Sequence, residues 1–183
     1  MRVIAGSARS VPLKTPQGEE TRPTQDRIKE TLFNILQADI PYSVVIDGCA
    51  GSGAIGIEAL SRGASKAYFI ENSKEPYECI KFNLEHTKLQ NKGIVIKGDI
   101  CPGLAGIKEE HVDIVFLDPP YGKKIEREAL KVLKKAAYVD SETLIIIEAD
   151  INEDFSDIET LGFAITREKC YKNNKHLFLR KED

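Results

Sequence analysis

The stretch SVVIDGCAGSGAIG, residues 43–56, joins a short apolar run to a glycine-rich loop and decides the fold. Residues 44–46 have the length and β-branched composition of a buried strand. Gly51, Gly53 and Gly56 follow with G-x-G-x-x-G spacing, where an amphipathic stretch begins. In this strand–turn–helix context, glycines allow a tight turn and a close approach of ligand to backbone. Close packing of the strand on the helix explains one such glycine more easily than several, so we expect a nucleotide-like cofactor here.

Beyond this loop, short apolar runs alternate with longer amphipathic stretches. The further apolar runs are residues 67–70, 94–96, 112–117 and 144–147, and the amphipathic stretches are 54–62, 75–88 and 126–137. This alternation predicts an α/β fold with parallel strands, right-handed crossovers and helices on both faces. Residues 163–170 and 175–180 flank a turn-like Lys172-Asn173-Asn174 and predict an antiparallel C-terminal hairpin. We expect a Rossmann-like, mostly parallel sheet of seven strands.

The first 40 residues differ from this core and predict an extension packed on it. Residues 3–4 and 11–13 suggest a small basic hairpin, and Thr24 is a plausible N-cap for a following helix. The apolar face of that helix would consist of Ile28, Leu32, Ile35 and Leu36. Pro41 is expected to close it. We therefore treat residues 1–183 as one domain, with an extension at 1–40 and a catalytic core at 41–183.

Length and composition fit one ordinary soluble domain, since the chain has 183 residues, 42% hydrophobic and 30% charged. The start has no apolar signal region, and no apolar run approaches the roughly 18 residues that cross a bilayer, so we expect a cytoplasmic protein without membrane contact. The cysteines form no C-x-x-C pair, which argues against a zinc or redox motif, and no metal is expected. The isolated His86, His111 and His176 are interpreted as structural or solvent-facing.

Charge is unevenly distributed along the chain. The formal net charge of −3 alone argues against a nucleic-acid partner. However, residues 1–18 carry three basic residues and no acid, and residues 167–181 carry six basic residues against Glu168 alone. Because screening confines each charge to roughly 10 Å, local surplus matters more than the total. Each cluster is either part of a nucleic-acid surface or a solvated face.

The acids that follow the predicted strands indicate which cofactor fits. A dinucleotide would place an anionic pyrophosphate at the glycine loop, where Asp47 would repel it. S-adenosylmethionine instead carries an ammonium and a sulfonium, which a carboxylate at Asp47 can help to neutralise. Glu71 can accept from ribose hydroxyls in either cofactor, and Asp99 can accept from an adenine amino group or be an ordinary loop acid. The predicted cofactor-binding residues are Asp47, Ala50, Gly51, Ser52, Gly53, Glu71, Asn72, Asp99 and Ile100.

A second motif, Asp118-Pro119-Pro120-Tyr121, follows the apolar run 112–117 directly. Prolines that end a strand explain the two prolines but not the acid and the aromatic. An exocyclic amine is a poor nucleophile because its lone pair is delocalised into the ring. The Asp118 carboxylate and the Pro119 carbonyl can accept its N–H bonds and stabilise the positive charge that develops. Tyr121 offers a face on which a flipped base can stack. We predict Asp118, Pro119, Pro120 and Tyr121 as catalytic residues.

With both motifs in place, the core resembles the class I methyltransferases, and Asp-Pro-Pro-Tyr is similar to the motif of enzymes that modify exocyclic amines. Residues 2–6, 13–16, 21–36 and 51–64 are similar to the signature of the RsmD-type 16S rRNA (guanine-N2)-methyltransferases. The resemblance spans essentially the whole chain, with departures at Gly48-Cys49, Arg9-Ser10 and Tyr171-Lys172.

This resemblance implies transfer of a methyl group from S-adenosylmethionine to N2 of one guanine in 16S rRNA. It implies a substrate within the assembled or assembling small ribosomal subunit, and we expect a monomer. The predicted RNA-contacting residues are Arg2, Arg9, Arg22, Thr24 and Arg27. The last three would lie near the cofactor and the RNA entrance.

Other functions remain open at the level of sequence. A DNA adenine-N6 or protein glutamine N-methyltransferase needs the same kind of loop, although no separate base-recognition region is evident. An NAD-dependent oxidoreductase fits the glycine spacing but not Asp47, and no Tyr-x-x-x-Lys pair is obvious. A non-catalytic RNA-binding module predicts that Asp118→Ala has no effect in cells. Glu148 and Tyr171 receive no role at this stage.

Overall fold

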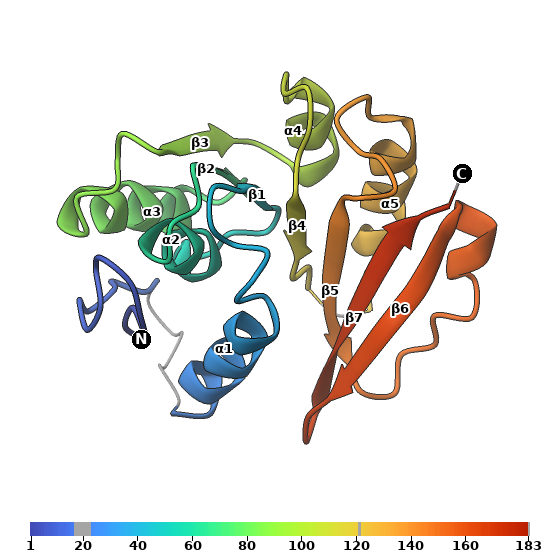
Figure 1. Cartoon of the computed structure of the whole chain (residues 1–183), viewed down its shortest axis with the longest axis horizontal. Helices are drawn as coiled ribbons and strands as arrows, with labels where there is room; N and C mark the ends of the chain where they lie inside the picture. Colours follow the sequence, from blue (N-terminus) through green and yellow to red (C-terminus); the bar gives the residue numbers. More distant parts are fainter. Residues whose placement is uncertain (17–22, 121, 183) are drawn as a thin grey trace.

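The computed structural model describes residues 1–16, 23–120 and 122–182, and these ranges form an α/β fold built on a single sheet (Figure 1). The strands of the described chain are β1 Val44–Asp47, β2 Lys66–Glu71, β3 Gly93–Lys97, β4 Ile114–Leu117, β5 Leu144–Asp150, β6 Phe163–Cys170 and β7 Asn174–Lys181. The helices are α1 Pro23–Ile35, α2 Ala54–Ser61, α3 Lys74–His86, α4 Ile100–Gly106 and α5 Ile125–Lys135, with a short 3-10 helix η1 at Ile158–Leu161. Among these helices, none combines the length and the apolar composition needed to span a bilayer.

The seven described strands lie in the order β3-β2-β1-β4-β5-β7-β6. Strands β1 to β5 pair in parallel, whereas β7 runs antiparallel to both β5 and β6. This confirms the predicted mostly parallel sheet with an antiparallel C-terminal hairpin. The chain moves outward in one direction from β1 to β3 and returns to β4 on the other side of β1. The carboxyl ends of β1 and β4 therefore flank the switch point, where open α/β sheets bind ligands.

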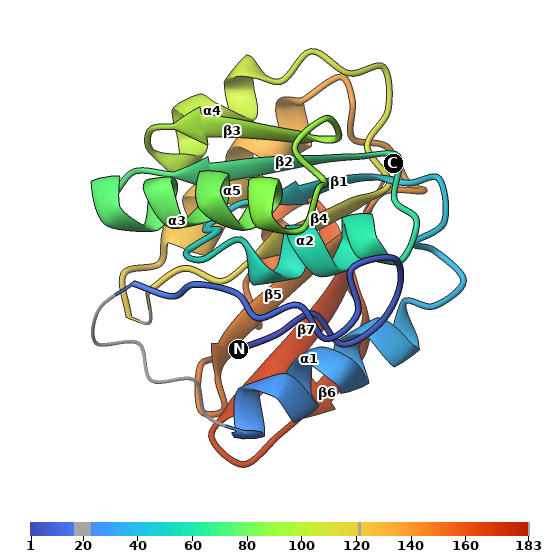
Figure 2. The same cartoon turned by 90° about the vertical axis from the view of Figure 1, so that its left-hand side faces the viewer.

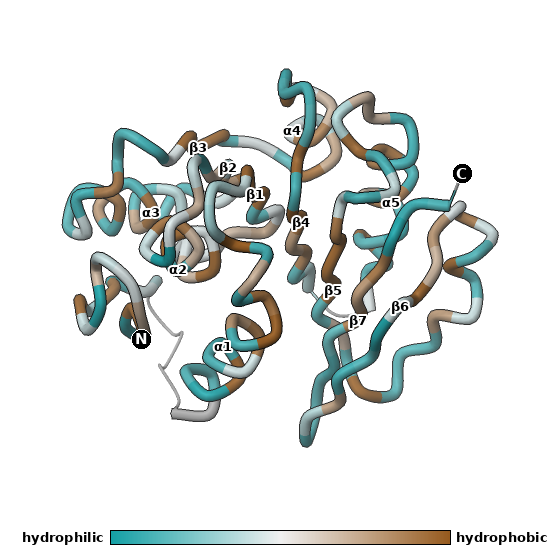
Figure 3. The backbone as a smooth tube through the Cα atoms, in the orientation of Figure 1, coloured by the Kyte–Doolittle hydropathy of each residue, from teal (hydrophilic) through white to brown (hydrophobic). Residues whose placement is uncertain are grey.

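Residues of each central strand alternate between two hydrophobic clusters, one on each face of the sheet. Val45, Ile114 and Phe116 pack with α1, α2 and α3, whereas Ile46 and Val115 pack with α4 and α5. In Figure 2, α2 and α3 lie on the viewer's side of the strands and α5 lies behind them. Figure 3 shows the hydrophobic course of β5 and the more hydrophilic outer end of the β6–β7 hairpin. Burial on both faces explains why the central strands β1, β4 and β5 contain continuous apolar runs.

The N-terminal segment, residues 1–16, is fastened to α2 and α1 by a buried acid. Glu58 is 0% exposed and accepts hydrogen bonds from the backbone N–H groups of Ile4 and Ala5 at 2.8 and 3.0 Å. Lys29 Nζ of α1 lies 3.4 Å from the same carboxylate, and Arg62 Nε lies 2.7 Å from it. A single side chain therefore holds the start of the chain, α1 and the end of α2 together.

Close backbone contact completes this attachment at Gly6. A Cβ built on Gly6 would lie 1.8 Å from the carbonyl oxygen of Ser61, and the φ of Gly6 is +86°. The hydroxyl of Ser61 donates to the carbonyl of Ala5 at 2.6 Å and accepts from the N–H of Ala8 at 2.9 Å. The position therefore requires glycine for both space and backbone conformation.

The N-terminal elements differ in detail from the sequence prediction. The predicted hairpin is an isolated antiparallel bridge between Arg2 and Pro12 rather than a pair of strands. Helix α1 already begins at Pro23, so Thr24 lies in the first turn and not at the N-cap. Proline suits the first helical position because a backbone N–H at that position would have no acceptor within the helix. The helix ends at Ile35, well before Pro41.

Helix α4 was not predicted, because its sequence contains Pro102, Gly103 and Gly106. The packing of α4 requires glycine at position 103. A Cβ at Gly103 would lie only 2.7 Å from Ile70 Cγ2 of β2, which is too close. The helix therefore rests on the sheet more closely than a larger residue would allow, and tertiary contact overrides weak local propensity.

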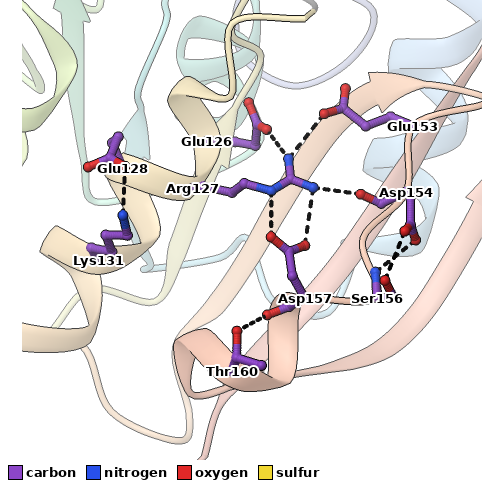
Figure 4. Close-up of polar contacts among 9 residues, drawn as sticks. All are labelled: Glu126, Arg127, Glu128, Lys131, Glu153, Asp154, Ser156, Asp157 and Thr160. Atoms are coloured by element: carbon purple, nitrogen blue, oxygen red, sulfur yellow. Dashed lines mark hydrogen bonds and ion pairs between the residues drawn. The ribbon is translucent and has the colours of Figure 1, made fainter.

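On the same face as α4, Arg127 ties α5 to the loop between β5 and η1 (Figure 4). Its guanidinium binds both carboxylate oxygens of Asp157, at 2.7 and 3.1 Å, and Glu153 at 3.0 Å. It also pairs with Glu126 and donates to the carbonyl oxygen of Asp154 at 2.5 Å. The hydrogen bonds that Arg127 donates to Asp157 raise the pKa of Arg127 further, so this cation remains charged.

Candidate active site

A cleft of about 1690 Å³ opens at the carboxyl ends of the parallel strands. Its walls come from the loops after β1, β2, β3 and β4, from the ends of β5 and β7, and from one side of α1. The volume exceeds that of typical small-ligand pockets, roughly 300–1,000 Å³, so the cleft can hold a cofactor and part of a second molecule together.

The glycine loop after β1 takes the shape predicted from its sequence. Gly51 and Gly53 have φ values of +52° and +77°, in the region that favours glycine. Gly51 lines the cleft, and a Cβ built on it would meet nothing within 4 Å. Gly53 is buried beside Ile80 and does not line the cleft. Gly51 therefore leaves open space above the loop, whereas Gly53 serves the turn and its packing.

Asp47, at the end of β1, lies at the bottom of this loop with 2% exposure. Its Oδ2 accepts a hydrogen bond from the N–H of Gly56 at 3.0 Å. Burial raises the pKa of Asp47 to about 7, and the nearby Glu71 carboxylate adds to the rise, while the bond from Gly56 opposes it. A cation entering the cleft would favour the ionised form of this carboxyl group.

The residues predicted to bind the ribose and the adenine meet beside the glycine loop. Glu71 accepts hydrogen bonds from the backbone N–H of Gly51 at 3.0 Å and of Ser73 at 2.8 Å. Asn72 donates from Nδ2 to Asp99 Oδ1 at 2.9 Å. All five of these residues line the cleft, together with Ala50, Ser52 and Ile100. Eight of the nine predicted cofactor residues therefore converge on one site, Gly53 being the exception.

The Asp-Pro-Pro loop closes the neighbouring part of the cleft. Asp118, Pro119 and Pro120 line it, and Pro119 is buried. The backbone N–H of Gly48 donates to the carbonyl of Phe116 at 2.8 Å, so the ends of β1 and β4 are joined here. Tyr121 lies outside the described residues. The structure thus brings the predicted cofactor site and most of the predicted catalytic loop together.

Cys49 lies between these two loops. Burial raises the pKa of its thiol to about 12, and the carboxylates of Asp118, Asp47 and Glu71 contribute further. A thiol that stays protonated is a poor nucleophile. Covalent chemistry at Cys49 is therefore disfavoured, although this cysteine borders the cleft.

The predicted RNA residues are distributed more widely. Arg27 of α1 lines the cleft, whereas Arg2 and Arg9 lie on the N-terminal segment outside its lining. Arg2 Nε is 4.0 Å from the Asp26 carboxylate, and Arg9 is exposed. Arg22 and the side chain of Thr24 lie outside the described part of the chain.

Sequence reasoning missed one group of polar residues on the wall formed by β5 and β7. Glu148 Oε1 accepts from Asn174 Nδ2 at 2.6 Å, and its Oε2 lies 3.0 Å from His176 Nε2. The other ring nitrogen of His176 lies 3.3 Å from the hydroxyl of Tyr171. All four line the cleft, and His176 is 1% exposed, so it is structural rather than solvent-facing, but it is not isolated. A signal was present in the sequence: Asn174 and His176 are two residues apart in a predicted hairpin, so their side chains lie on the same face of the strand.

Fold and site together define the class of the protein as a class I methyltransferase. The carboxylate below an open glycine loop, the acids after β2 and β3 and the Asp-Pro-Pro loop fit S-adenosylmethionine, and methyltransferases of this class use that cofactor. Within residues 1–16, 23–120 and 122–182, no group of three or more His, Cys, Asp or Glu side chains is arranged to hold a metal ion.

Comparison with known proteins identifies the family. The chain belongs to the family described as Conserved hypothetical protein 95, whose model matches residues 1–180. Its relatives include Ribosomal RNA small subunit methyltransferase D of Haemophilus influenzae, 38% identical over 82% of this chain and 79% of that protein. The protein of the same name from Escherichia coli strain K12 is 34% identical over 92% of this chain and 84% of that protein. The solved structure of yhhF from Escherichia coli, a proposed methyltransferase, is 30% identical with a TM-score of 0.83, covering 100% of this chain and 98% of that one.

Proposed function

We propose that this protein transfers a methyl group from S-adenosylmethionine to the exocyclic N2 of one guanine in 16S rRNA. The observation that carries the proposal is the meeting of Asp118-Pro119-Pro120 with the glycine loop of β1 in one cleft. The names of the relatives from Haemophilus influenzae and Escherichia coli support RNA of the small ribosomal subunit as the substrate.

The residues of the cleft supply positioning and charge. S-adenosylmethionine, when bound, supplies a methyl group on a positively charged sulfur. Asp47 would balance the cationic part of the cofactor, and Glu71 would accept from its ribose hydroxyls. Asn72, Asp99 and Ile100 would hold the adenine end, beside Ala50, Gly51 and Ser52. Gly53 would act through the turn.

The Asp-Pro-Pro loop would prepare the amine. The Asp118 carboxylate and the Pro119 carbonyl would accept its two N–H bonds, so that the nitrogen lone pair is directed toward the methyl group. Pro120 would stiffen the loop, and Tyr121 would stack on the flipped base, a contact worth about 1–3 kcal/mol. After transfer, the nitrogen would release a proton toward Asp118.

The N-terminal extension, residues 1–40, would guide the RNA and cover the cofactor, with residues 41–183 as the catalytic core. Arg27 would reach the RNA at the cleft, and Arg2, Arg9, Arg22 and Thr24 would contact it along the extension. We further propose that the substrate is an assembled or assembling small ribosomal subunit, that the protein acts as a monomer, and that the reaction takes place in the cytoplasm, where these subunits form.

A transfer assay tests the function. Small ribosomal subunits from a strain that lacks the enzyme would be incubated with tritiated S-adenosylmethionine, digested to nucleosides and separated. We expect labelled N2-methylguanosine with the wild type and at least a hundredfold less with Asp118→Ala. Asp39→Ala, which removes an exposed acid after α1, is the matched control and should keep the wild-type rate. Label on N6-methyladenine in DNA, on glutamine in protein, or on another nucleoside would contradict the proposed target, and NAD released on denaturation would contradict the cofactor.

A further inference from the structure

Glu148 lies beside the Asp-Pro-Pro loop and has no part in the function proposed above. Strands β4 and β5 are parallel and pair Leu117 with Ile147. The residues that follow these two are Asp118, just past the end of β4, and Glu148, within β5. The two acids therefore lie side by side at the same height along the sheet. Both line the cleft. The cleft thus carries a second carboxylate next to the one that would hold the amine.

Glu148 is held in place by two partners on β7, of which His176 is buried. Glu148 and His176 are paired residues of the antiparallel strands β5 and β7, so their side chains leave the sheet on the same face. The His176 ring packs edge-on against Phe116 and Tyr171, with centroids 5.9 and 5.1 Å apart. Asn174, two residues earlier on the same strand, binds the other carboxylate oxygen.

The contacts of His176 fix the direction of its hydrogen bonds. Burial raises the pKa of Tyr171, and the Glu148 carboxylate raises it further, so the phenol keeps its proton. That proton can be donated to His176 Nδ1, which leaves Nε2–H directed at Glu148. The network therefore supplies Glu148 with donors on its inner side and keeps it an acceptor.

Acceptor capacity remains on the side of the cleft. A carboxylate has about four lone-pair sites, and Asn174 and His176 use one on each oxygen. The Glu148 side chain is 20% exposed, whereas that of His176 is 1% exposed. A base entering the cleft would therefore meet an oriented acceptor here.

Guanine is the base that matches two adjacent acceptors. Its N1–H and its N2 amine are neighbouring donors on the edge by which a flipped base is read. Adenine and cytosine place their exocyclic amine beside a ring nitrogen that carries a lone pair, and a carboxylate would repel it. We propose that Glu148 selects guanine by accepting a hydrogen bond from N1–H while Asp118 accepts from the N2 amine. This inference rests on the proposed function.

The test uses a base that differs at N1. Small subunits would be reconstituted with 16S rRNA that carries either guanosine or 2-aminopurine riboside at the mapped target position. 2-Aminopurine keeps the amine but has a lone pair at N1. The wild type should prefer guanosine, and Glu148→Gln should lower this preference at least tenfold, because its amide can donate to the lone pair. Since 2-aminopurine also lacks the guanine carbonyl, the measured quantity is the change in preference between enzymes.

Three controls keep the outcome clear. Glu142→Gln changes an exposed glutamate just before β5 and should keep the wild-type preference. Binding of S-adenosylhomocysteine by Glu148→Gln should equal that of the wild type. Should Glu148→Gln fail to fold, Glu148→Asp withdraws the acceptor by one methylene, and a smaller loss of preference is expected because aspartate cannot donate to the lone pair. An unchanged preference in a folded variant overturns the role of Glu148, whereas a wild type that makes no N2-methylguanosine overturns the proposed function and this inference with it.

Discussion

Two buried carboxylates belong to the same β1–α2 unit, but their surroundings differ sharply. Glu58, 0% exposed, has Lys29 and Arg62 within 3.4 Å and accepts two backbone hydrogen bonds. Asp47, 2% exposed, accepts a bond from the N–H of Gly56 and faces the glutamate Glu71. Within the described residues, no lysine or arginine forms an ion pair with Asp47.

The comparison separates an acid that builds the fold from one that we propose binds a ligand. Burial alone opposes ionisation, so a buried carboxylate needs cations and N–H donors to remain charged. Glu58 receives them from three segments of its own chain. Asp47 receives too few, its pKa is raised to about 7, and it borders the cleft. The missing positive charge is the one that the ammonium of S-adenosylmethionine would supply.

The largest expected effect is on stability and comes from Glu58→Gln. This change leaves the buried Lys29 without its countercharge and weakens the attachment of Ile4 and Ala5. Removing one partner of a buried ion pair typically costs about 3–5 kcal/mol. Urea unfolding should show a loss of this size, with Glu85→Gln, an exposed site on α3, as the matched control. A loss below 1 kcal/mol would mean that Glu58 does not hold these segments together.

Asp47→Asn should raise the stability of the cofactor-free protein, the opposite of Glu58→Gln, and should strongly weaken cofactor binding. The amide oxygen can still accept from Gly56, and the unfavourable buried charge is removed. We expect the cofactor-free protein at pH 8 to gain about 1 kcal/mol, after allowing for an amide N–H₂ without a full set of partners. Affinity for S-adenosylhomocysteine, measured by calorimetry, should fall about ten- to hundredfold because a charged hydrogen-bond acceptor is lost. Unchanged affinity would place the cationic group of the cofactor elsewhere.

The pH dependence of binding sharpens the same contrast. The folded pKa of Asp47 lies near 7, above its ordinary value of 3.8, so this group makes the cofactor-free fold less stable as pH rises from about 4 to 7. A cationic ligand binds the ionised form, so affinity should rise about tenfold between pH 6 and pH 8. Calorimetry in buffers with different ionisation enthalpies should detect proton release below pH 7. Asp47→Asn should abolish both effects, and a slope that persists in this variant would assign it to another group.

Much of the fold followed from the sequence because periodicity and burial agree in the core. Each parallel strand contains a continuous apolar run, and the β6–β7 hairpin has a polar turn at its tip. Helix α4 escaped prediction because a helix with Gly103 is selected by its contact with Ile70 and not by propensity. The bridge between Arg2 and Pro12 depends on anchoring by Glu58, which lies 53 and 54 residues away from its partners in sequence.

The site was predictable where its residues follow strand ends in sequence. Asp47, Glu71 and Asp118 each come directly after an apolar run, Asp99 follows its run after Lys97 and Gly98, and all four meet at the same edge of the sheet. The Glu148 network was not predictable from spacing, because Glu148 and His176 are joined only by the antiparallel pairing of β5 with β7. Knowledge of that register, rather than of either residue, reveals the contact. Likewise, the partners of Glu58 become visible only once α1 and the N-terminal segment are docked.

The smallest change in the free energy of unfolding is expected from Arg127→Lys. The Arg127 network has at least as many charged partners as that of Glu58 but is more exposed, so this variant tests whether exposure to solvent weakens such a network. Arg127 has three acidic partners, but Asp157 is 46% exposed, so water can replace part of each contact. Lysine keeps the charge and loses the paired bonds to Asp157. We expect a loss of about 1 kcal/mol in urea unfolding, with the exposed Arg9→Lys as control. A loss as large as that of Glu58→Gln would show that the Arg127 network carries the fold to the same degree, and that burial is not what distinguishes the two.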